Sequence, residues 1–252
     1  MQLDPSLLVT AGFLTTLALA MKQARNENLD QVTMFWFGAW GIAGALNGGH
    51  LLHALSHPKE LAADPLLLFR VMDGGKAVFG AFCGAGFLGW LYLRWQREPF
   101  LRYADAVMPA IALGYAIVRA GCFLNGDDFG TVSTVPWAVQ FPQGTEAFIS
   151  HVNRGLITAG STSSLPVHPT QLYHVAAGLL LYILLHRWQG KWAGSRVALA
   201  LAGYGVLRFV LQFFRGDAVP LVSHLDDSQL FSLGFLMVAG LLCVTGQKQE
   251  KT

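Results

Sequence analysis

Long apolar runs separated by short polar stretches dominate this chain. A helix needs about 20 mostly apolar residues to cross a bilayer, because each residue advances about 1.5 Å through a hydrocarbon layer about 30 Å thick. The pattern therefore predicts an all-α integral membrane protein, a bundle of about seven transmembrane helices. The predicted spans are residues 5–21, 33–55, 75–95, 104–122, 169–187, 193–215 and 228–247.

The positive residues between these runs predict the orientation of the bundle, because cytoplasmic loops are enriched in lysine and arginine. With the N-terminus outside and the C-terminus inside, ten of the 17 positive residues face the cytoplasm. A cleavable signal peptide carries positive charge before its apolar run, whereas Lys22 and Arg25 follow this one. We therefore expect an N-out, C-in protein whose first span is retained.

One long stretch, residues 126–167, lies outside the predicted spans and on the outer face. It contains the strand-like sequence VPWAVQF and the Ser/Thr/Gly-rich sequence TAGSTSSLP. Loops of this length in a compact protein are usually functional or mobile. We expect residues 1–252 to form a single polytopic membrane domain and residues 126–167 to form an extracytoplasmic insertion in it.

Composition supports the membrane prediction and excludes other classes. The chain is 53% hydrophobic and only 13% charged, about half the charged fraction of soluble domains. A net charge of +2 is too small to indicate a nucleic-acid partner. The three cysteines lie far apart, and the histidines His50, His53 and His57 have no acidic residue or cysteine beside them in sequence. We expect no metal site and no cofactor.

Glycines recur every three or four residues in the second and third predicted spans. Small residues at this spacing let membrane helices approach closely, so we expect ordinary close packing there. The glycines are Gly38, Gly41, Gly44 and Gly48 in one span and Gly80 and Gly84 in the other.

Two arginines lie within or at the end of the predicted spans. A charged side chain at the centre of a span costs about 2.5–3.5 kcal/mol on insertion scales, so Arg119 and Arg208 are expected to face the bundle interior and mark a site. Tyr204 and Gln212 lie four residues before and after Arg208, on the same helix face. Arg215, seven residues after Arg208, either extends this face or reaches the outer lipid headgroups.

The fifth predicted span opens with HPTQLYH, residues 168–174. Proline is favoured at the first helical position, which makes His168 the expected cap and Pro169 the expected first residue. The helix N-terminus would face outward, and its free N–H groups suit an anion. Together with the two arginines, it predicts a pocket for a lipid phosphate.

The stretches RAGCFLNGDDFG, HPTQLYH and YGVLRFVLQFFRGD resemble three signature stretches of the prolipoprotein diacylglyceryl transferases, over about residues 30–217. The resemblance implies a multi-pass enzyme of the bacterial cytoplasmic (inner) membrane. Such an enzyme moves diacylglycerol from phosphatidylglycerol, or a related anionic phospholipid, to the thiol of a lipobox cysteine in a secreted precursor. Glycerol phosphate leaves.

The resemblance also implies roles for single residues. Arg119 and Arg208 are expected to bind and neutralise the phosphate leaving group and so to be catalytic. The expected substrate-binding residues are Arg119, Asn125, Asp127, Gly130, Gln171, Tyr173 and Tyr204.

The chain departs from the family pattern at several polar positions. Phe79 replaces a histidine that is a candidate base for the acceptor thiol, Cys122 replaces an asparagine, and Gln212 replaces an acid. His174 replaces a glutamate, and a neutral imidazole suits proton removal near neutral pH. We therefore expect His174 to be the catalytic base, with His168 as its rival. A purely structural histidine is an equal alternative.

Two functions follow from these residues. The first is diacylglyceryl transfer to a lipobox thiol. The second is a diverged relative that binds or translocates lipid, or transfers it to another acceptor. Arg119 and Arg208 serve both functions, so only the acceptor chemistry separates them.

Overall fold

The computed structural model describes residues 5–69, 77–216 and 225–249. Each predicted apolar run overlaps one long helix of this described part, and the all-helical prediction is confirmed. The long helices are α1 (Pro5–Asn26), α2 (Gln31–Ser56), α4 (Val78–Gln96), α5 (Phe100–Asn125), α7 (Thr170–Arg187), α8 (Ser195–Gln212) and α9 (Asp227–Gln249). The short ones are α3 (Pro58–Ala63), the 3-10 helix η1 (Pro65–Phe69) and α6 (Glu146–Asn153).

The outer surfaces of these helices are apolar. Among the described residues, three helical stretches are long and apolar enough to cross a membrane: Leu7–Asn26, Phe100–Asn125 and Asp227–Gly246. Protein covers only 17%, 39% and 22% of their respective apolar windows. Long, mostly apolar helices that are so little covered by protein are suited to contact with lipid.

One local prediction is wrong, and one of the two alternatives for Arg215 is excluded. Pro169 precedes α7 at its N-cap position, where no side chain caps the helix, so His168 is not the cap. The Nδ1 atom of His168 makes a 3.0 Å hydrogen bond with the Tyr173 hydroxyl, so this ring nitrogen caps no backbone N–H group of the helix. Helix α8 ends at Gln212, so Arg215 lies beyond it and does not extend the helical face of Arg208.

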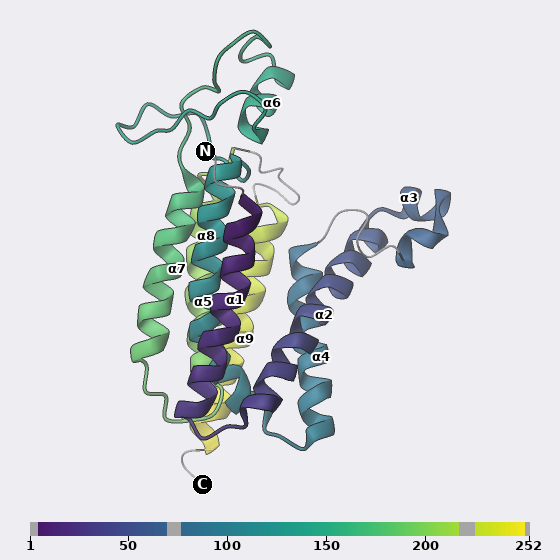
Figure 1. Ribbon diagram of the computed structural model, residues 1–252, viewed down its shortest axis with the longest axis vertical. Coiled ribbons are helices and arrows are strands. Elements are labelled where there is room, and N and C mark those ends of the chain that lie inside the picture. The colour runs from purple at the N-terminus through teal and green to yellow at the C-terminus, as the bar shows by residue number, and fades with distance from the viewer. Residues whose placement is uncertain (1–4, 70–76, 217–224, 250–252) are drawn as a thin grey trace. The chain divides into compact units, whose positions relative to one another are not determined.

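The chain forms two compact units, Met1–Leu19 with Val107–Thr252, and Ala20–Ala106. In the first unit, helices from α1, α5, α7, α8 and α9 form a bundle (Figure 1). Thr16 of α1 donates a hydrogen bond to the Ala110 carbonyl of α5 at 3.4 Å. Helices α5, α7 and α8 share an apolar core made by Ala112, Leu181, Leu185 and Ala200.

The segment between α5 and α7 lies at one end of this bundle and carries α6 (Figure 1). It has its own buried core of Phe129, Phe141, Ala147 and Val167. The strand-like sequence makes isolated bridges rather than a sheet, and Val139 and Val167 exchange two backbone hydrogen bonds of 3.0 Å. The segment is therefore a packed structure that can hold neighbouring residues in fixed positions.

In the second unit, α2 and α4 pack through glycines. A Cβ atom on Gly84 would lie 2.1 Å from the Gly44 carbonyl oxygen, and one on Gly48 would lie 2.3 Å from the Gly80 oxygen. The predicted close packing is confirmed for these four glycines. Gly41 takes no part, because a Cβ atom there would meet nothing within 4 Å.

Replacing Gly84 should separate α2 from α4. We expect Gly84→Ala to destabilise the protein by about 1–3 kcal/mol or more, because the added methyl group meets backbone rather than a flexible side chain. The thermal unfolding midpoint of the purified protein in detergent measures this. Gly86→Ala on the same helix is the control, since its methyl group meets nothing within 4 Å. Equal midpoints for the two variants would contradict the packing argument.

Candidate active site

Tyr115 of α5 connects three helices at the candidate site. The Arg119 guanidinium lies over the Tyr115 ring, 5.1 Å from its centroid. The Tyr115 hydroxyl makes a 3.0 Å hydrogen bond with Nδ1 of His174 on α7. The ring of Tyr204 on α8 meets the Tyr115 ring edge-on at 5.7 Å. Tyr115 lies one helical turn before Arg119, which is why both reach the same interior face.

His174 and Arg208 form the other half of this cluster. His174 is only 2% exposed. Arg208 places Nη1 3.4 Å from the Nε2 atom of His174 and donates from Nη2 to the Ser228 hydroxyl at 2.9 Å. Since arginine only donates, Nε2 accepts, and the proton of a neutral His174 lies on Nδ1, facing Tyr115. Together with Tyr115 and Tyr204, His174 and Arg208 line a hollow of about 10 Å³, room for about one water molecule.

The Asp128 carboxylate binds two arginines, Arg119 and Arg215. One carboxylate oxygen pairs with Arg119, and the other lies 2.5 Å from Nη2 of Arg215. The side chains of Arg119 and Arg215 are 15% and 8% exposed. Burial raises the pKa of the Asp128 carboxyl, but the two guanidinium groups together lower it further, from 3.8 to about 2. Asp128 is therefore ionised at every physiological pH and balances charge on two nearly buried cations.

The turn that carries Asp128 is held from α7. Gly126 and Asp128 have φ angles of +71° and +56°, in the left-handed region that glycine and aspartate tolerate best. Thr170 donates to the Asp128 carbonyl and Gln171 to the Asp127 carbonyl, each at 2.6 Å. Both donors are completely buried. The first turn of α7 thus fixes the backbone that presents the two aspartates.

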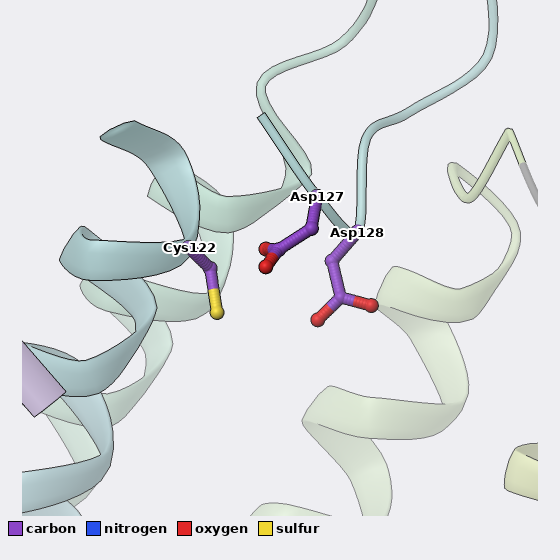
Figure 2. A group of neighbouring side chains, drawn as sticks. All are labelled: Cys122, Asp127 and Asp128. Atoms are coloured by element: carbon purple, nitrogen blue, oxygen red, sulfur yellow. The ribbon is translucent and has the colours of Figure 1, made fainter. Parts of the chain in front are cut away.

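Cys122, Asp127 and Asp128 form a compact group (Figure 2). One possible ligand atom from each lies within 4.8 Å of the others. The Asp127 carboxylate points toward Cys122, whereas the Asp128 carboxylate points in a different direction (Figure 2). Asp127 accepts a 2.9 Å hydrogen bond from Asn125. Because both Asp128 oxygens already face guanidinium groups, a cation would compete with two arginines, and we assign no metal to this group.

Gly130 brings Arg215 to Asp128. A Cβ atom on Gly130 would lie 2.4 Å from the His168 carbonyl oxygen, and one on Gly216 would lie 2.4 Å from the Gly130 oxygen. Gly130 and Arg215 form an isolated antiparallel bridge. The chain beyond α8 can run this close to the turn only where side chains are missing.

The predicted site residues divide into three groups. Arg119, Arg208, His174 and Tyr204 meet around Tyr115, and Asn125, Asp127, Gly130 and Gln171 build the turn. His168 and Tyr173 form a separate pair, to which Trp137 donates at 2.7 Å.

Sequence reasoning missed several residues that build the site. Tyr115 had a usable signal, because it lies four residues before Arg119 on the same helix face. Thr170 lies within the HPTQLYH stretch. Asp128 lies within RAGCFLNGDDFG, but nothing local indicated its pairing with Arg215. Ser228 carried no local signal, since its contact reaches Arg208 on another helix.

These features define an all-helical membrane protein with arginines held in a polar cluster among apolar helices. The sequence profile described as prolipoprotein diacylglyceryl transferase matches residues 6–245. The chain belongs to this family of multi-pass membrane enzymes, and the resemblance drawn from its three stretches is confirmed.

Three relatives are each named phosphatidylglycerol–prolipoprotein diacylglyceryl transferase. The one from Pasteurella multocida is 30% identical, over 97% of this chain and 89% of its own. The one from Vibrio cholerae (El Tor Inaba) is 31% identical, over 96% and 86%. The one from Idiomarina loihiensis is 33% identical, over 84% and 76%. The similarity therefore extends over nearly the whole chain.

Gly130→Ala should lower both stability and activity, because the methyl group would lie 2.4 Å from the His168 carbonyl oxygen and 2.9 Å from that of Phe214 and push both segments away from the turn. We expect an unfolding penalty of about 1–3 kcal/mol or more. The thermal midpoint and the transfer rate are measured together. Gly160→Ala, whose methyl group meets nothing within 4 Å, should match the parent in both. A normal midpoint with lost activity would instead mean that Gly130 acts through substrate contact alone.

Proposed function

We propose that this protein transfers diacylglycerol from phosphatidylglycerol to the thiol of a lipobox cysteine in a secreted precursor. The convergence of Arg119 and Arg208 on Tyr115 and His174 carries the proposal. A phosphodiester is the anion that lipid offers at such a site, and arginine binds phosphate oxygens through paired donors.

The proposed arrangement in the membrane follows from the same residues. Seven helices span the inner membrane with the N-terminus outside, and residues 126–167 form an extracytoplasmic insertion of the single domain 1–252. The charge distribution of the loops supports this orientation. It places Arg119, near the end of α5, at the outer side, where a secreted precursor arrives.

The reaction exchanges one bond for another. The thiol sulfur attacks the terminal glyceryl carbon of the diacylglycerol part, and the bond from that carbon to the phosphate oxygen breaks. Glycerol phosphate leaves with the electron pair, and its phosphate changes from a singly charged diester to a monoester of higher charge. Arg119 and Arg208 stabilise the charge that develops on this phosphate.

The turn and α7 supply acceptors for the rest of the headgroup. One buried oxygen each of Asp127 and Gln171 has no hydrogen-bond donor among the described residues. Buried acceptors of this kind are normally satisfied, so headgroup hydroxyls are suitable partners. Asn125 and Gly130 keep this turn in place, and Tyr204 and Tyr173 border the two polar groups.

We assign the proton-accepting role to His174. Its Nε2 atom faces Arg208 at 3.4 Å. When Arg208 turns to the phosphate, Nε2 becomes able to accept the thiol proton, while the bond to Tyr115 keeps the ring oriented. The rival, His168, is held by Tyr173 outside this cluster.

A lipobox peptide incubated with phosphatidylglycerol and the purified protein tests the proposed function. Its mass should increase by one diacylglyceryl group. A standard family member serves as the positive control. If that control works and the protein binds phosphatidylglycerol without any mass shift, lipid binding or transfer to a different acceptor takes the place of this proposal.

Arg119→Ala should lower the transfer rate by about 10²–10³-fold, the effect of removing one donor to a developing anion. Arg119→Lys should recover little, because lysine lacks the planar pair of donors. Rates are measured at equal amounts of folded, membrane-inserted protein. Near-parental turnover of the alanine variant would remove Arg119 from the site.

His174→Gln should lower the rate by about 10²-fold or more and abolish the acidic limb of the pH–rate profile, because glutamine cannot take a proton. His168→Gln is the matched control and should keep that limb. If His174→Gln keeps both the rate and the limb, His174 is structural.

A further inference from the structure

The two oxygens of the Asp128 carboxylate bridge two guanidinium groups. Arg119 comes from the end of α5 and Arg215 from the segment beyond α8, so only the tertiary fold brings them to one anion. A phosphate group presents oxygens to two arginines in the same manner. Asp128 thus occupies the kind of position in which a lipid phosphate would bind Arg119.

The Asp128 side chain can leave this position without disturbing the turn. Its backbone is held through its own carbonyl by Thr170 and through the preceding carbonyl by Gln171. The side chain itself is 30% exposed, whereas both guanidinium partners are half as exposed or less. A rotation about the Cα–Cβ bond can therefore bring the carboxylate toward water while the arginines stay in place.

We propose that Asp128 is an internal competitor for the phosphate, so that its carboxylate and the phosphate of the lipid or product alternate on Arg119 and Arg215. The proposal rests on the function proposed above and adds a residue that sets anion affinity and product release. Exchanging one anion for another keeps both buried cations compensated throughout.

The competition matters most for the product. Glycerol phosphate is a monoester with a second pKa near 6, so at neutral pH it carries more charge than the diester substrate and binds a guanidinium pair more tightly. A carboxylate tethered beside the pair acts at high local concentration. Its return displaces the product and limits product inhibition.

Asp128→Asn tests the competition, because asparagine keeps the size of the side chain and removes its charge. If the carboxylate occupies the arginines nine times in ten, removing it tightens anion binding by about tenfold. We expect the inhibition constant of glycerol phosphate to fall by about that factor, and its stabilisation of the protein against thermal unfolding to increase. The measurements use the protein in nanodiscs, with sn-glycerol 1-phosphate, the glycerol phosphate that leaves phosphatidylglycerol, as the added ligand.

Glu98→Gln is the control for a general charge effect. Glu98 lies between α4 and α5, in the second compact unit, and belongs to none of the groups that build the site. The substitution removes one negative charge and keeps the size of the side chain. We expect its inhibition constant for glycerol phosphate to stay within about twofold of the parent, since a charge outside the site is screened by water and salt.

Unchanged or weaker binding of glycerol phosphate by Asp128→Asn overturns the proposal and makes Asp128 a positioning residue for the arginines. The same tightening in Glu98→Gln also overturns it, because a general charge effect would then suffice. If Asp128→Asn is unstable, 10 mM glycerol phosphate should restore its folding more than it stabilises the parent, and lack of rescue counts against the proposal. Thermal stabilisation by glycerol phosphate is measured without turnover. Failure of this proposal can therefore be told apart from failure of the proposed transfer function.

Discussion

Charge compensation for arginines among apolar helices is the constraint on which this structure depends. A guanidinium cannot lose its proton in a protein and is costly in a low-dielectric medium, so each one needs an anion, an acceptor or an aromatic face nearby. Arg119 has Asp128 and the Tyr115 ring, Arg215 has Asp128, and Arg208 has His174 and Ser228. The polar contacts of the site are largely the result of this requirement.

Meeting that requirement takes contributions from distant parts of the chain. Thr170 and Gln171 fix the turn after α5 from the first turn of α7, and Gly130 and Gly216 let the chain beyond α8 approach the same turn. The packed core of the insertion stabilises the segment between them. A glycine or a buried amide here is therefore as important to the site as the arginine that it positions.

The same constraint connects binding with catalysis. An arginine that is bound to an acceptor side chain of the protein can exchange it for a phosphate at little net electrostatic cost, because one acceptor replaces another. In the proposed reaction, this exchange releases Asp128 from Arg119 and Nε2 of His174 from Arg208. Binding of the lipid and preparation of the base would then be parts of one rearrangement.

The sequence by itself determined the membrane class, the helical runs and the family. Apolar length and the glycine spacing of α2 and α4 are local properties, and rare stretches such as HPTQLYH identify a family directly. It also indicated Arg119 and Arg208, because charge inside an apolar run is visible one residue at a time.

Only the tertiary structure decided what those arginines contact. The pairing of Asp128 with Arg215, and of Arg208 with Ser228, joins residues 87 and 20 positions apart along the chain. Only the structure likewise showed that Pro169, and not His168, stands at the N-cap of α7. Hydrogen bonds and ion pairs of this kind depend on distances across the fold, which residue patterns do not encode.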